Sequence, residues 1–372
     1  MHRRTSEPVS APLPPGSTIG ILGGGQLGRM LTLAAARLGL KCHVYSDASG
    51  PAFDVATHHT VNAYEDVGRI EDFARSVDVV TYEFENVPLP AATAAERIRP
   101  VRPPPKALAV AQDRLEEKRF VADLGLPVAR FAAVDGESDF RAATQSVGVE
   151  AILKTRRLGY DGKGQVRINA ATEVAAAFDE IGRNPAVLEA FVAFDYEVSI
   201  LAVRGLSGEV RFYDAPLNTH RSGILHTSTV PSPLAGSRVA RAREIAKAIA
   251  DALDYVGVLA VEMFYLGGEA KEPLVVNEFA PRVHNSGHWT IDACAVSQFE
   301  NHIRAVAGWP LGPTERHSDA VMTNLVGQDA DDWPHLAAEP GTCLHLYGKR
   351  DARPDRKMGH ITRLSPKSQR PT

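Results

Sequence analysis

The sequence predicts a protein of mixed α/β and α+β class, in which a parallel α/β domain precedes an α+β domain and a small β-rich domain. Strand and helix patterns alternate from residue 18 to about residue 100, which is typical of a parallel sheet with crossover helices. Later strand patterns follow one another through turns, mostly without helices between them. The chain has 372 residues, 44% of them apolar and 23% charged, which is enough for two or three domains with sizeable cores.

Residues 1–17 are rich in proline and polar side chains, and we expect a disordered extension there. The parallel α/β domain is predicted over residues 18–110. Its first strand, TIGILGGG, leads into the helix QLGRMLTLAAARLG, whose apolar residues share one stripe. The strands KCHVYS and VDVVTYEF follow, with the short helix IEDFARS between them. The proline-rich segment RPVRPPPKA is predicted to be a linker.

The α+β domain is predicted over residues 111–312, and the small C-terminal domain over residues 313–372. A helix beginning near Asp113 opens the α+β domain, and the amphipathic helix VARAREIAKAIADALD interrupts its strands. The predicted strands of the two domains are EAILKT, QVRI, AVLEAFV, EVSILAVR, EVRFYDAP, GVLAVEMFYL and PLVVNEFA, then AVMTNLVG, TCLHLYGK and GHITRL.

Charge and cysteine usage narrow the range of partners. The formal net charge of −4 provides no overall basic field for non-specific nucleic-acid binding. Cys42, Cys294 and Cys343 are far apart and never form a CxxC pair, which indicates reduced thiols in a cytoplasmic protein. No apolar run approaches the roughly 20 residues of a membrane-spanning helix, and no apolar stretch at the N-terminus is typical of a secretory signal. We expect a cytoplasmic protein without nucleic-acid or membrane partners.

A first glycine loop is a candidate phosphate site. Gly23, Gly25 and Gly28 fit G-x-G-x-x-G between a strand and a helix, and Asp47 follows near the end of the next strand. This pattern is typical of dinucleotide binding, but the free amides of a helix N-terminus favour any phosphate. Three interpretations stay open: NAD or FAD, a different phosphorylated ligand, and a structural tight turn.

A second glycine loop follows a strand that carries Lys154. In RRLGYDGKGQ, the glycines Gly159, Gly162 and Gly164 surround Lys163. Such a cationic loop can fold over a polyphosphate and meet its oxygens with amides and an ammonium group. It is not a Walker A loop, because no G-K-[ST] begins a helix here. The structural alternative is a flexible hairpin turn.

Two carboxylates occur within apolar strand patterns, Glu262 in VLAVEMFYL and Glu278 in VVNEFA. The turn LGGEAKEP between them predicts that the two strands are antiparallel neighbours. Buried carboxylates without partners are costly, so the pair predicts a bound cation. Ligands that are all oxygen indicate Mg²⁺ in preference to zinc. The alternative is that arginines such as Arg282 pair with both carboxylates.

The order of Lys154, the second glycine loop and the carboxylate pair resembles the ATP-grasp superfamily, in which nucleotide lies between two α+β lobes. From about residue 18 to residue 364, the sequence is similar to the N5-carboxyaminoimidazole ribonucleotide synthases of purine biosynthesis. The resemblance implies an ATP-grasp fold with an N-terminal Rossmann-like domain, a two-lobed central domain and a small β-rich C-terminal domain. The motifs that carry it are GILGGGQLGRML, VTYEFENVP, RRLGYDGKGQ, YVGVLAVEMF, NEFAPRVHNSGHWT and GKRDARPDRKMGH.

The resemblance also implies a ligase that uses ATP and Mg²⁺ and forms a homodimer. ATP would phosphorylate bicarbonate to carboxyphosphate, which delivers its carboxyl group, as CO₂, to the exocyclic amine of 5-aminoimidazole ribonucleotide. The residues suit this chemistry, because phosphoryl transfer needs charge neutralisation and positioning more than a covalent nucleophile.

The resemblance assigns site residues one by one, with the backbone of the hinge Glu189–Val192 at adenine and Glu197 at the ribose. At ATP it places Arg114, Lys154, Gly159, Tyr160, Asp161, Gly162, Lys163, Gly164, Gln165, Glu189, Ala190, Phe191, Val192, Glu197, His220, Asn277 and Glu278. The metal ligands would be Glu262 and Glu278, and the catalytic residues Arg282, His284 and Asn285. At 5-aminoimidazole ribonucleotide it places Gln26, Leu27, Glu83, Lys349 and Arg356.

Some of these assignments have alternatives without a role in binding or catalysis. His220 could be a surface-loop histidine, and the basic cluster of Lys349, Arg350, Arg353, Arg356 and Lys357 could be a solvated face. The alternative functions are another ATP-grasp ligase of purine metabolism, such as formate-dependent glycinamide ribonucleotide transformylase, and a nucleotide-binding protein without catalysis.

Two features depart from the pattern. Ala280 stands where many ATP-grasp enzymes carry asparagine, and strand alternation predicts that Ala280, not Asn277, lies beside Glu278. The chain also ends soon after GHITRL, where we expect relatives to continue with a further helical stretch.

Overall fold

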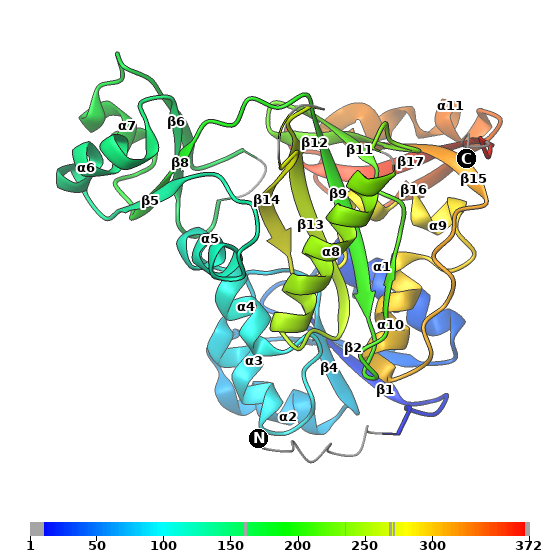
Figure 1. The fold of residues 1–372 in the computed structure, drawn as a ribbon. Coiled ribbons are helices and arrows are strands. Elements are labelled where there is room, and N and C mark those ends of the chain that lie inside the picture. Colours follow the sequence, from blue (N-terminus) through cyan, green and yellow to red (C-terminus); the bar gives the residue numbers. More distant parts are fainter. Residues whose placement is uncertain (1–10, 160–161, 235, 268–269, 271, 369–372) are drawn as a thin grey trace, which may run out of the picture.

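The structure is a computed structural model that describes residues 11–159, 162–234, 236–267, 270 and 272–368. It contains a four-stranded sheet at the N-terminal end, a second four-stranded sheet and a nine-stranded sheet. Figure 1 shows the second small sheet with its helices standing to one side of the body that the other two sheets form. Within the described residues, no helix is both long and apolar enough to cross a membrane.

The N-terminal sheet is parallel, with strand order β3-β2-β1-β4, as predicted. Strands β1 and β4 are buried along almost their whole length, because helices cover both faces of the sheet. The strands are β1 (Thr18–Leu22), β2 (Lys41–Ser46), β3 (His58–Val61) and β4 (Val79–Tyr82), and the helices are α1 (Gln26–Arg37), α2 (Val67–Arg75), α3 (Leu89–Glu96) and α4 (Pro105–Ala111).

Two segments expected to lack structure are part of the packed body. Leu13 donates its N–H to the carbonyl of Ala307 at 2.9 Å, and its own carbonyl accepts from the indole of Trp309 at 2.7 Å. The expected disorder is therefore wrong for residues 11–17, and residues 1–10 lie outside the described chain. The predicted linker contributes the first turn of α4, because proline at a helix start gives up no hydrogen bond that the helix needs.

The second small sheet is antiparallel, with order β5-β8-β6-β7, and we call it with its helices the small lobe. Helix α6 covers it with Phe140, Ala143 and Val147, a narrow apolar stripe that the sequence analysis did not recognise. Helix α5 (Arg114–Asp123) precedes the lobe and begins near Asp113 as predicted, and the side chain of Asp113 caps it. The lobe comprises β5 (Phe131–Val134), α6 (Glu137–Val147), β6 (Ala151–Thr155), β7 (Gln165–Ile168), α7 (Val174–Glu180) and β8 (Ala186–Ala190).

The nine-stranded sheet has the order β14-β13-β9-β11-β12-β15-β17-β16, with β10 paired to β9. Strands β15, β17 and β16 come from the predicted C-terminal domain and continue the sheet of the central domain. The hairpin β11–β12 was not predicted. The strands are β9 (Tyr196–Arg204), β10 (Val210–Phe212), β11 (Leu217–Arg221), β12 (Ile224–Val230), β13 (Gly257–Tyr265), β14 (Leu274–Ala280), β15 (Ser318–Val326), β16 (Thr342–Leu346) and β17 (Lys357–Pro366).

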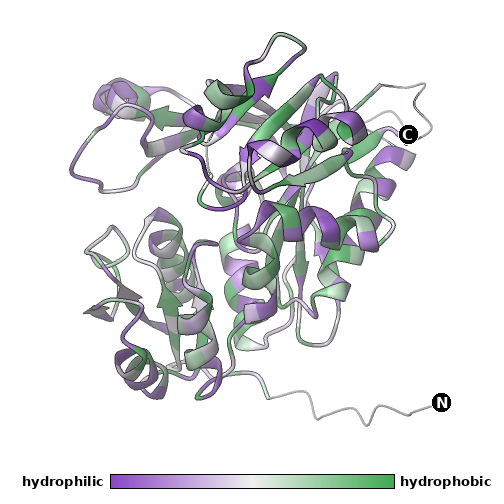
Figure 2. Cartoon of the chain, turned by 90° about the vertical axis from the view of Figure 1, so that its left-hand side faces the viewer, coloured by the Kyte–Doolittle hydropathy of each residue, from purple (hydrophilic) through white to green (hydrophobic). Residues whose placement is uncertain are grey.

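The centre of this sheet is buried on both faces. Helix α8 (Ser237–Ala252) packs on the face that presents Leu259 and Val261, and helix α10 (Gln298–Ala307) packs with α1 on the face that presents Val258 and Ala260. Figure 2 shows the apolar residues gathered on strands and inner helix sides. Double burial explains the unbroken apolar run of β13, and it makes this sheet a rigid platform. The short elements are η1 (Asn285–Gly287), α9 (Thr290–Ala293), η2 (Gly327–Asp332) and α11 (Trp333–Ala338).

Candidate active site

A cavity of about 850 Å³ lies where the three sheets meet. It brings together residues from distant parts of the chain, from the start of α1 to the start of β17. The predicted site residues that line it are Gln26, Leu27, Glu83, Arg114, Lys154, Gly159, Gly162, Lys163, Gln165, Glu197, His220, Glu262, Asn277, Glu278, Arg282, His284, Asn285, Lys349 and Arg356.

The carboxylate pair lies on neighbouring antiparallel strands, and Glu262 is directly opposite Glu278. The pairing shifts by one residue at this point, so that Asn277 has no partner on β13. This β-bulge lets both Asn277 and Glu278 line the cavity, whereas Ala280 does not line it. The expectation that Ala280 lies beside Glu278 in place of Asn277 is therefore wrong, because a bulge interrupts the alternation of strand faces.

The two carboxylates have different electrostatic surroundings. Glu278 accepts a hydrogen bond from Arg114 at 2.8 Å, and Arg114 outweighs the effect of burial and lowers the pKa of Glu278. Burial and the neighbouring Glu278 raise the pKa of Glu262, whose oxygen lies 3.3 Å from Nε2 of His284. The sequence analysis gave arginine pairing as the alternative to a bound cation. Glu278 does have an arginine partner, but this partner is Arg114 and not Arg282.

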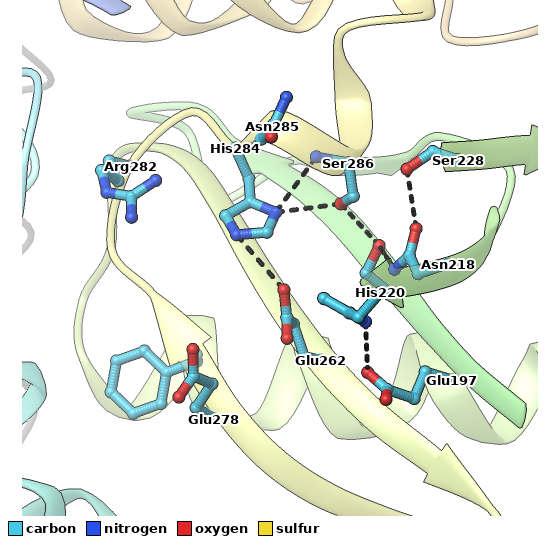
Figure 3. A network of polar contacts seen from close by, with 12 residues as sticks. Glu197, Asn218, His220, Ser228, Glu262, Glu278, Arg282, His284, Asn285 and Ser286 are labelled. Atoms are coloured by element: carbon cyan, nitrogen blue, oxygen red, sulfur yellow. Dashed lines mark hydrogen bonds and ion pairs between the residues drawn. The ribbon is translucent and has the colours of Figure 1, made fainter. Parts of the chain in front are cut away.

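His220 lies on β11 and faces the cavity, so the alternative of a surface-loop histidine is wrong. Its Nδ1 is 3.1 Å from a carboxylate oxygen of Glu197, and Figure 3 shows this pair beside Glu262. Burial alone would lower the pKa of His220, but Glu197 outweighs it and raises that pKa. Ligand atoms of Glu197, His220 and Glu262 all lie within 4.8 Å of one another, which is close enough to share one cation.

Lys154 is held at the cavity wall by a buried carboxylate. Its Nζ donates to Glu189 at 3.2 Å, and Lys118 lies 3.0 Å from the same oxygen. The two lysines outweigh burial and lower the pKa of Glu189 to about 2. Lys118 also donates to the carbonyl of Asn277 at 2.6 Å and so links the small lobe to β14. The sequence analysis missed Lys118, although it lies one helical turn after Arg114 and therefore on the same side of α5.

Part of the second glycine loop lines the cavity, and part has a structural role. Tyr160 and Asp161 lie outside the described residues. Gly164 has φ +70°, and a Cβ there would come within 2.6 Å of the hydroxyl of Thr155. We conclude that Gly164 serves the turn between β6 and β7 and not the cavity wall.

The predicted hinge, Glu189, Ala190, Phe191 and Val192, does not line the cavity. The N–H groups of Ala190 and Phe191 donate to the carbonyls of Arg130 and Glu150, at 2.8 and 2.9 Å. The cavity wall contains instead the parallel rings of Phe194 and Phe264, with centroids 4.5 Å apart. Flat apolar faces of this kind suit the stacking of a base. The sequence analysis missed both phenylalanines, since their contact joins the segment before β9 to β13.

The first glycine loop surrounds an internal carboxylate. Glu83 accepts hydrogen bonds from the N–H groups of Gly25 and Gly28, the latter at 2.6 Å. A Cβ on Gly23 or Gly25 would collide with the Glu83 side chain. The glycine pattern thus makes room for a buried carboxylate at the N-terminus of α1, where a dinucleotide would place its pyrophosphate.

We therefore expect no specific binding of NAD or FAD. Glu83 already occupies the amides that the pyrophosphate would need, and it would repel a second anion. Isothermal titration calorimetry with NAD should show no saturable heat. Stoichiometric binding in the micromolar range would contradict this prediction and would revive an oxidoreductase interpretation.

Arg282 is oriented by a carboxylate of the N-terminal domain. Its Nε and Nη2 donate to the two oxygens of Glu85, the latter at 3.0 Å, and Nη1 donates to the carbonyl of Val283. Burial would lower the pKa of Arg282, but Glu85 outweighs it and raises that pKa. The sequence analysis placed the motif VTYEFENVP in the resemblance but did not identify Glu85. Nearby, burial and then Arg282 lower the pKa of His284 to about 3.

The basic segment between β16 and β17 contributes Lys349 and Arg356 to the cavity. Both side chains are half-buried. Lys349 donates to the carbonyl of Lys357 at 2.7 Å, and Arg356 donates to the carbonyl of Asp351 at 3.1 Å. Arg350 is exposed and does not line the cavity, so the cluster is divided between a cavity side and a solvated side.

Comparison with known proteins places this arrangement in a family. Three family models match: the ribonucleotide synthetase preATP-grasp domain over residues 17–112, the ATP-grasp domain over residues 119–299, and the phosphoribosylaminoimidazole carboxylase C-terminal domain over residues 320–370. An N5-carboxyaminoimidazole ribonucleotide synthase of Brucella melitensis is 51% identical over 359 residues, covering 96% of this chain and 98% of the relative. The chain belongs to the N5-carboxyaminoimidazole ribonucleotide synthase family.

Other members agree with this assignment. The synthase of Pseudomonas aeruginosa is 44% identical, with 92% of this chain and 93% of the relative covered. A crystal structure of an N5-carboxyaminoimidazole ribonucleotide synthetase as its ADP complex superposes with a TM-score of 0.91 at 39% identity, covering 96% and 94% of the two chains. The synthase of Aspergillus clavatus in complex with ADP and 5-aminoimidazole ribonucleotide superposes with a TM-score of 0.86 at 30% identity, covering 95% and 94%. Members of the N5-carboxyaminoimidazole ribonucleotide synthase family are ATP-dependent ligases, and this confirms the predicted fold and enzyme class.

Proposed function

We propose that this ligase uses ATP and bicarbonate to carboxylate 5-aminoimidazole ribonucleotide, giving N5-carboxyaminoimidazole ribonucleotide, ADP and phosphate. One observation supports it above the others: a single cavity joins the RVHNSGH loop with the carboxylate strands, the glycine loop of α1 and the basic segment. Bicarbonate, nucleotide and a phosphorylated acceptor can therefore meet without leaving the protein. The names of the relatives, and the Aspergillus clavatus complex, point to the same acceptor.

We propose that Glu262 and Glu278 hold Mg²⁺. Two opposed carboxylates repel each other, and a divalent cation would relieve the repulsion that raises the pKa of Glu262. Among the residues that the structure describes, the buried Oδ1 of Asn277 finds no hydrogen-bond partner, and it adds a further oxygen on the same wall. The donor set is thus rich in oxygen, as Mg²⁺ prefers. When bound, the metal would supply charge neutralisation for the transferring phosphoryl group.

The chain's own residues supply the remaining positive charge. Lys154 and Arg114 line the nucleotide side of the cavity, and Arg282 lines the side of the RVHNSGH loop. We propose that Arg282 faces carboxyphosphate, because a planar guanidinium is suited to paired oxygens. Glu85 engages Nε and Nη2, and the carbonyl of Val283 engages Nη1, so these three contacts fix the orientation of the guanidinium. In the second step the C–O bond of carboxyphosphate breaks to give CO₂ and phosphate, and the exocyclic amine forms the new N–C bond to CO₂ as its proton passes to the released phosphate.

The acceptor would lie between α1 and the basic segment. Gln26, Leu27 and Glu83 line this end of the cavity, with Lys349 and Arg356 across from them as partners for the phosphate. We further propose a cytoplasmic homodimer, as the family resemblance implies. Light scattering coupled to gel filtration tests the dimer, and a monomer mass would contradict it.

The decisive experiment measures ADP release with ATP, Mg²⁺ and bicarbonate in the presence and absence of 5-aminoimidazole ribonucleotide. We expect turnover to require bicarbonate, and ¹³C from labelled bicarbonate to appear in the carbamate of the product. Glycinamide ribonucleotide with formate is the control for the alternative ligase. Turnover with that pair, and none with 5-aminoimidazole ribonucleotide, would overturn the proposal.

A further inference from the structure

A chain of buried polar side chains leads from His284 into the nine-stranded sheet (Figure 3). Nδ1 of His284 lies 2.9 Å from the hydroxyl of Ser286, which lies 2.7 Å from the hydroxyl of Ser199. Asn218 donates from Nδ2 to Ser199 at 3.1 Å and accepts at Oδ1 from Ser228 at 2.8 Å. Ser286, Ser199, Asn218 and Ser228, which we call the serine–asparagine chain, are at most 5% exposed.

The hydrogen bonds of this chain have one direction. An amide nitrogen only donates, and each hydroxyl has a single proton to give. Because Asn218 donates to Ser199, Ser199 directs its own proton to Ser286, and Ser286 directs its proton to Nδ1 of His284. Ser228, at the far end, donates to the amide oxygen, which is consistent with this orientation of the amide.

A second contact leads to the same result without depending on any hydroxyl or amide orientation. The main-chain N–H of Ser286 also donates to Nδ1 of His284, at 3.3 Å. A main-chain nitrogen cannot accept, so Nδ1 must offer a lone pair to it. Two donors therefore meet at Nδ1, and the ring proton belongs on Nε2. That nitrogen lies 3.3 Å from a carboxylate oxygen of Glu262.

We infer that the serine–asparagine chain fixes the tautomer of His284 that carries its proton on Nε2, and that His284 thereby donates to Glu262. Ser286, Ser199 and Asn218 are then positioning residues, because they act on the cavity through His284. In this tautomer, His284 orients a carboxylate and does not accept the proton that the amine releases. The effect of this tautomer on turnover rests on the proposed function, whereas the assignment of the tautomer itself rests on the hydrogen bonds alone.

The test combines nitrogen NMR of protein labelled with ¹⁵N-histidine and steady-state kinetics. A ring nitrogen that carries a proton and one that does not resonate in separate regions, and His284→Gln assigns the signals of His284. In the wild type we expect the proton on Nε2. Ser286→Ala removes the hydroxyl that donates to Nδ1, and Asn218→Leu removes the amide that orients the two hydroxyls. In both variants only the longer main-chain contact of 3.3 Å still favours the proton on Nε2, so the form with the proton on Nδ1 should appear in part of the population.

Of the steady-state constants, we expect the substitutions to change kcat and not KM. We expect kcat to fall about tenfold in both variants, the scale of one hydrogen bond to a charged group, with little change in KM for 5-aminoimidazole ribonucleotide. Asn301→Leu is the matched control, because Asn301 is equally buried, donates to the hydroxyl of Tyr213 and lies outside the cavity. This control should leave the signals of His284 unchanged.

Two results would overturn the inference: a wild-type proton on Nδ1, or unaltered His284 signals in both folded variants. If Asn218→Leu fails to fold, Ser286→Ala decides, since it removes a single oxygen atom. Absence of turnover with 5-aminoimidazole ribonucleotide in the wild type would contradict the proposed function, and the NMR result would still decide the tautomer.

Discussion

Glu278→Gln should lower Mg²⁺-dependent turnover by roughly 100-fold or more while the protein stays folded, because metal ions supply several kcal/mol of charge stabilisation in phosphoryl transfer. Glu278 lies opposite Glu262 on the cavity wall. The glutamine keeps the shape of the side chain and removes the charge that we propose to hold the metal. The measurement is ADP release at saturating substrates over a range of Mg²⁺ concentrations.

The same carboxylate accepts from Arg114, so the loss of that ion pair has to be separated from the loss of metal binding. A weakened metal site should raise the Mg²⁺ concentration needed for half-maximal turnover, whereas a displaced arginine should raise KM for ATP alone. Glu272→Gln is the matched control, because Glu272 is paired to Arg241 at 2.9 Å outside the cavity. Turnover like that of the wild type in folded Glu278→Gln at ordinary Mg²⁺ would exclude Glu278 as a metal ligand.

Arg356→Ala should raise KM for 5-aminoimidazole ribonucleotide about 10- to 150-fold and leave KM for ATP almost unchanged. A charge-assisted contact to phosphate contributes roughly 1.5–3 kcal/mol, whereas a solvated surface arginine contributes less than about 0.5 kcal/mol. Arg356 is half-buried at the acceptor end of the cavity, and its Nη1 donates to the carbonyl of Asp351.

Two controls make this result specific. Arg350→Ala removes an exposed arginine of the same segment that does not line the cavity, and its kinetics should match the wild type. The acceptor without its phosphate should bind weakly to the wild type and lose little more in Arg356→Ala. An equal loss for the phosphorylated and unphosphorylated acceptors would show that Arg356 does not contact the phosphate.

Much of the site was predictable, because its chemistry is carried by short motifs. The strands of Glu262 and Glu278 are joined by a short turn, so their antiparallel pairing followed from local sequence, and the structure confirms it. The alternation of strands and helices predicted the parallel N-terminal sheet for the same reason. Lys154 and Lys163 line the cavity. Both could be predicted, because the strand and the glycine loop that carry them follow each other directly in the sequence.

The errors arise where distant segments meet. The bulge at Asn277 depends on how β14 pairs with β13, and strand alternation alone predicted the wrong neighbour for Glu278. Glu83 lies at the glycines of α1 because β4 is hydrogen-bonded beside β1, a pairing that a dinucleotide motif does not reveal. Lys118 and Glu85 were missed for the same reason, since their partners Glu189 and Arg282 are far from them in the sequence.

The sequence by itself determined the class of the fold, the order of its motifs and the chemistry of most side chains that line the cavity. Periodicity and motif spacing are local properties, so they can be recognised in the sequence without knowledge of the folded chain. Only the tertiary structure decided that the C-terminal strands continue the central sheet, that Asn277 faces the cavity and that a carboxylate fills the first glycine loop. The physical reason is that register, bulges and buried ion pairs are set by contacts between residues far apart in the chain, which no local pattern encodes.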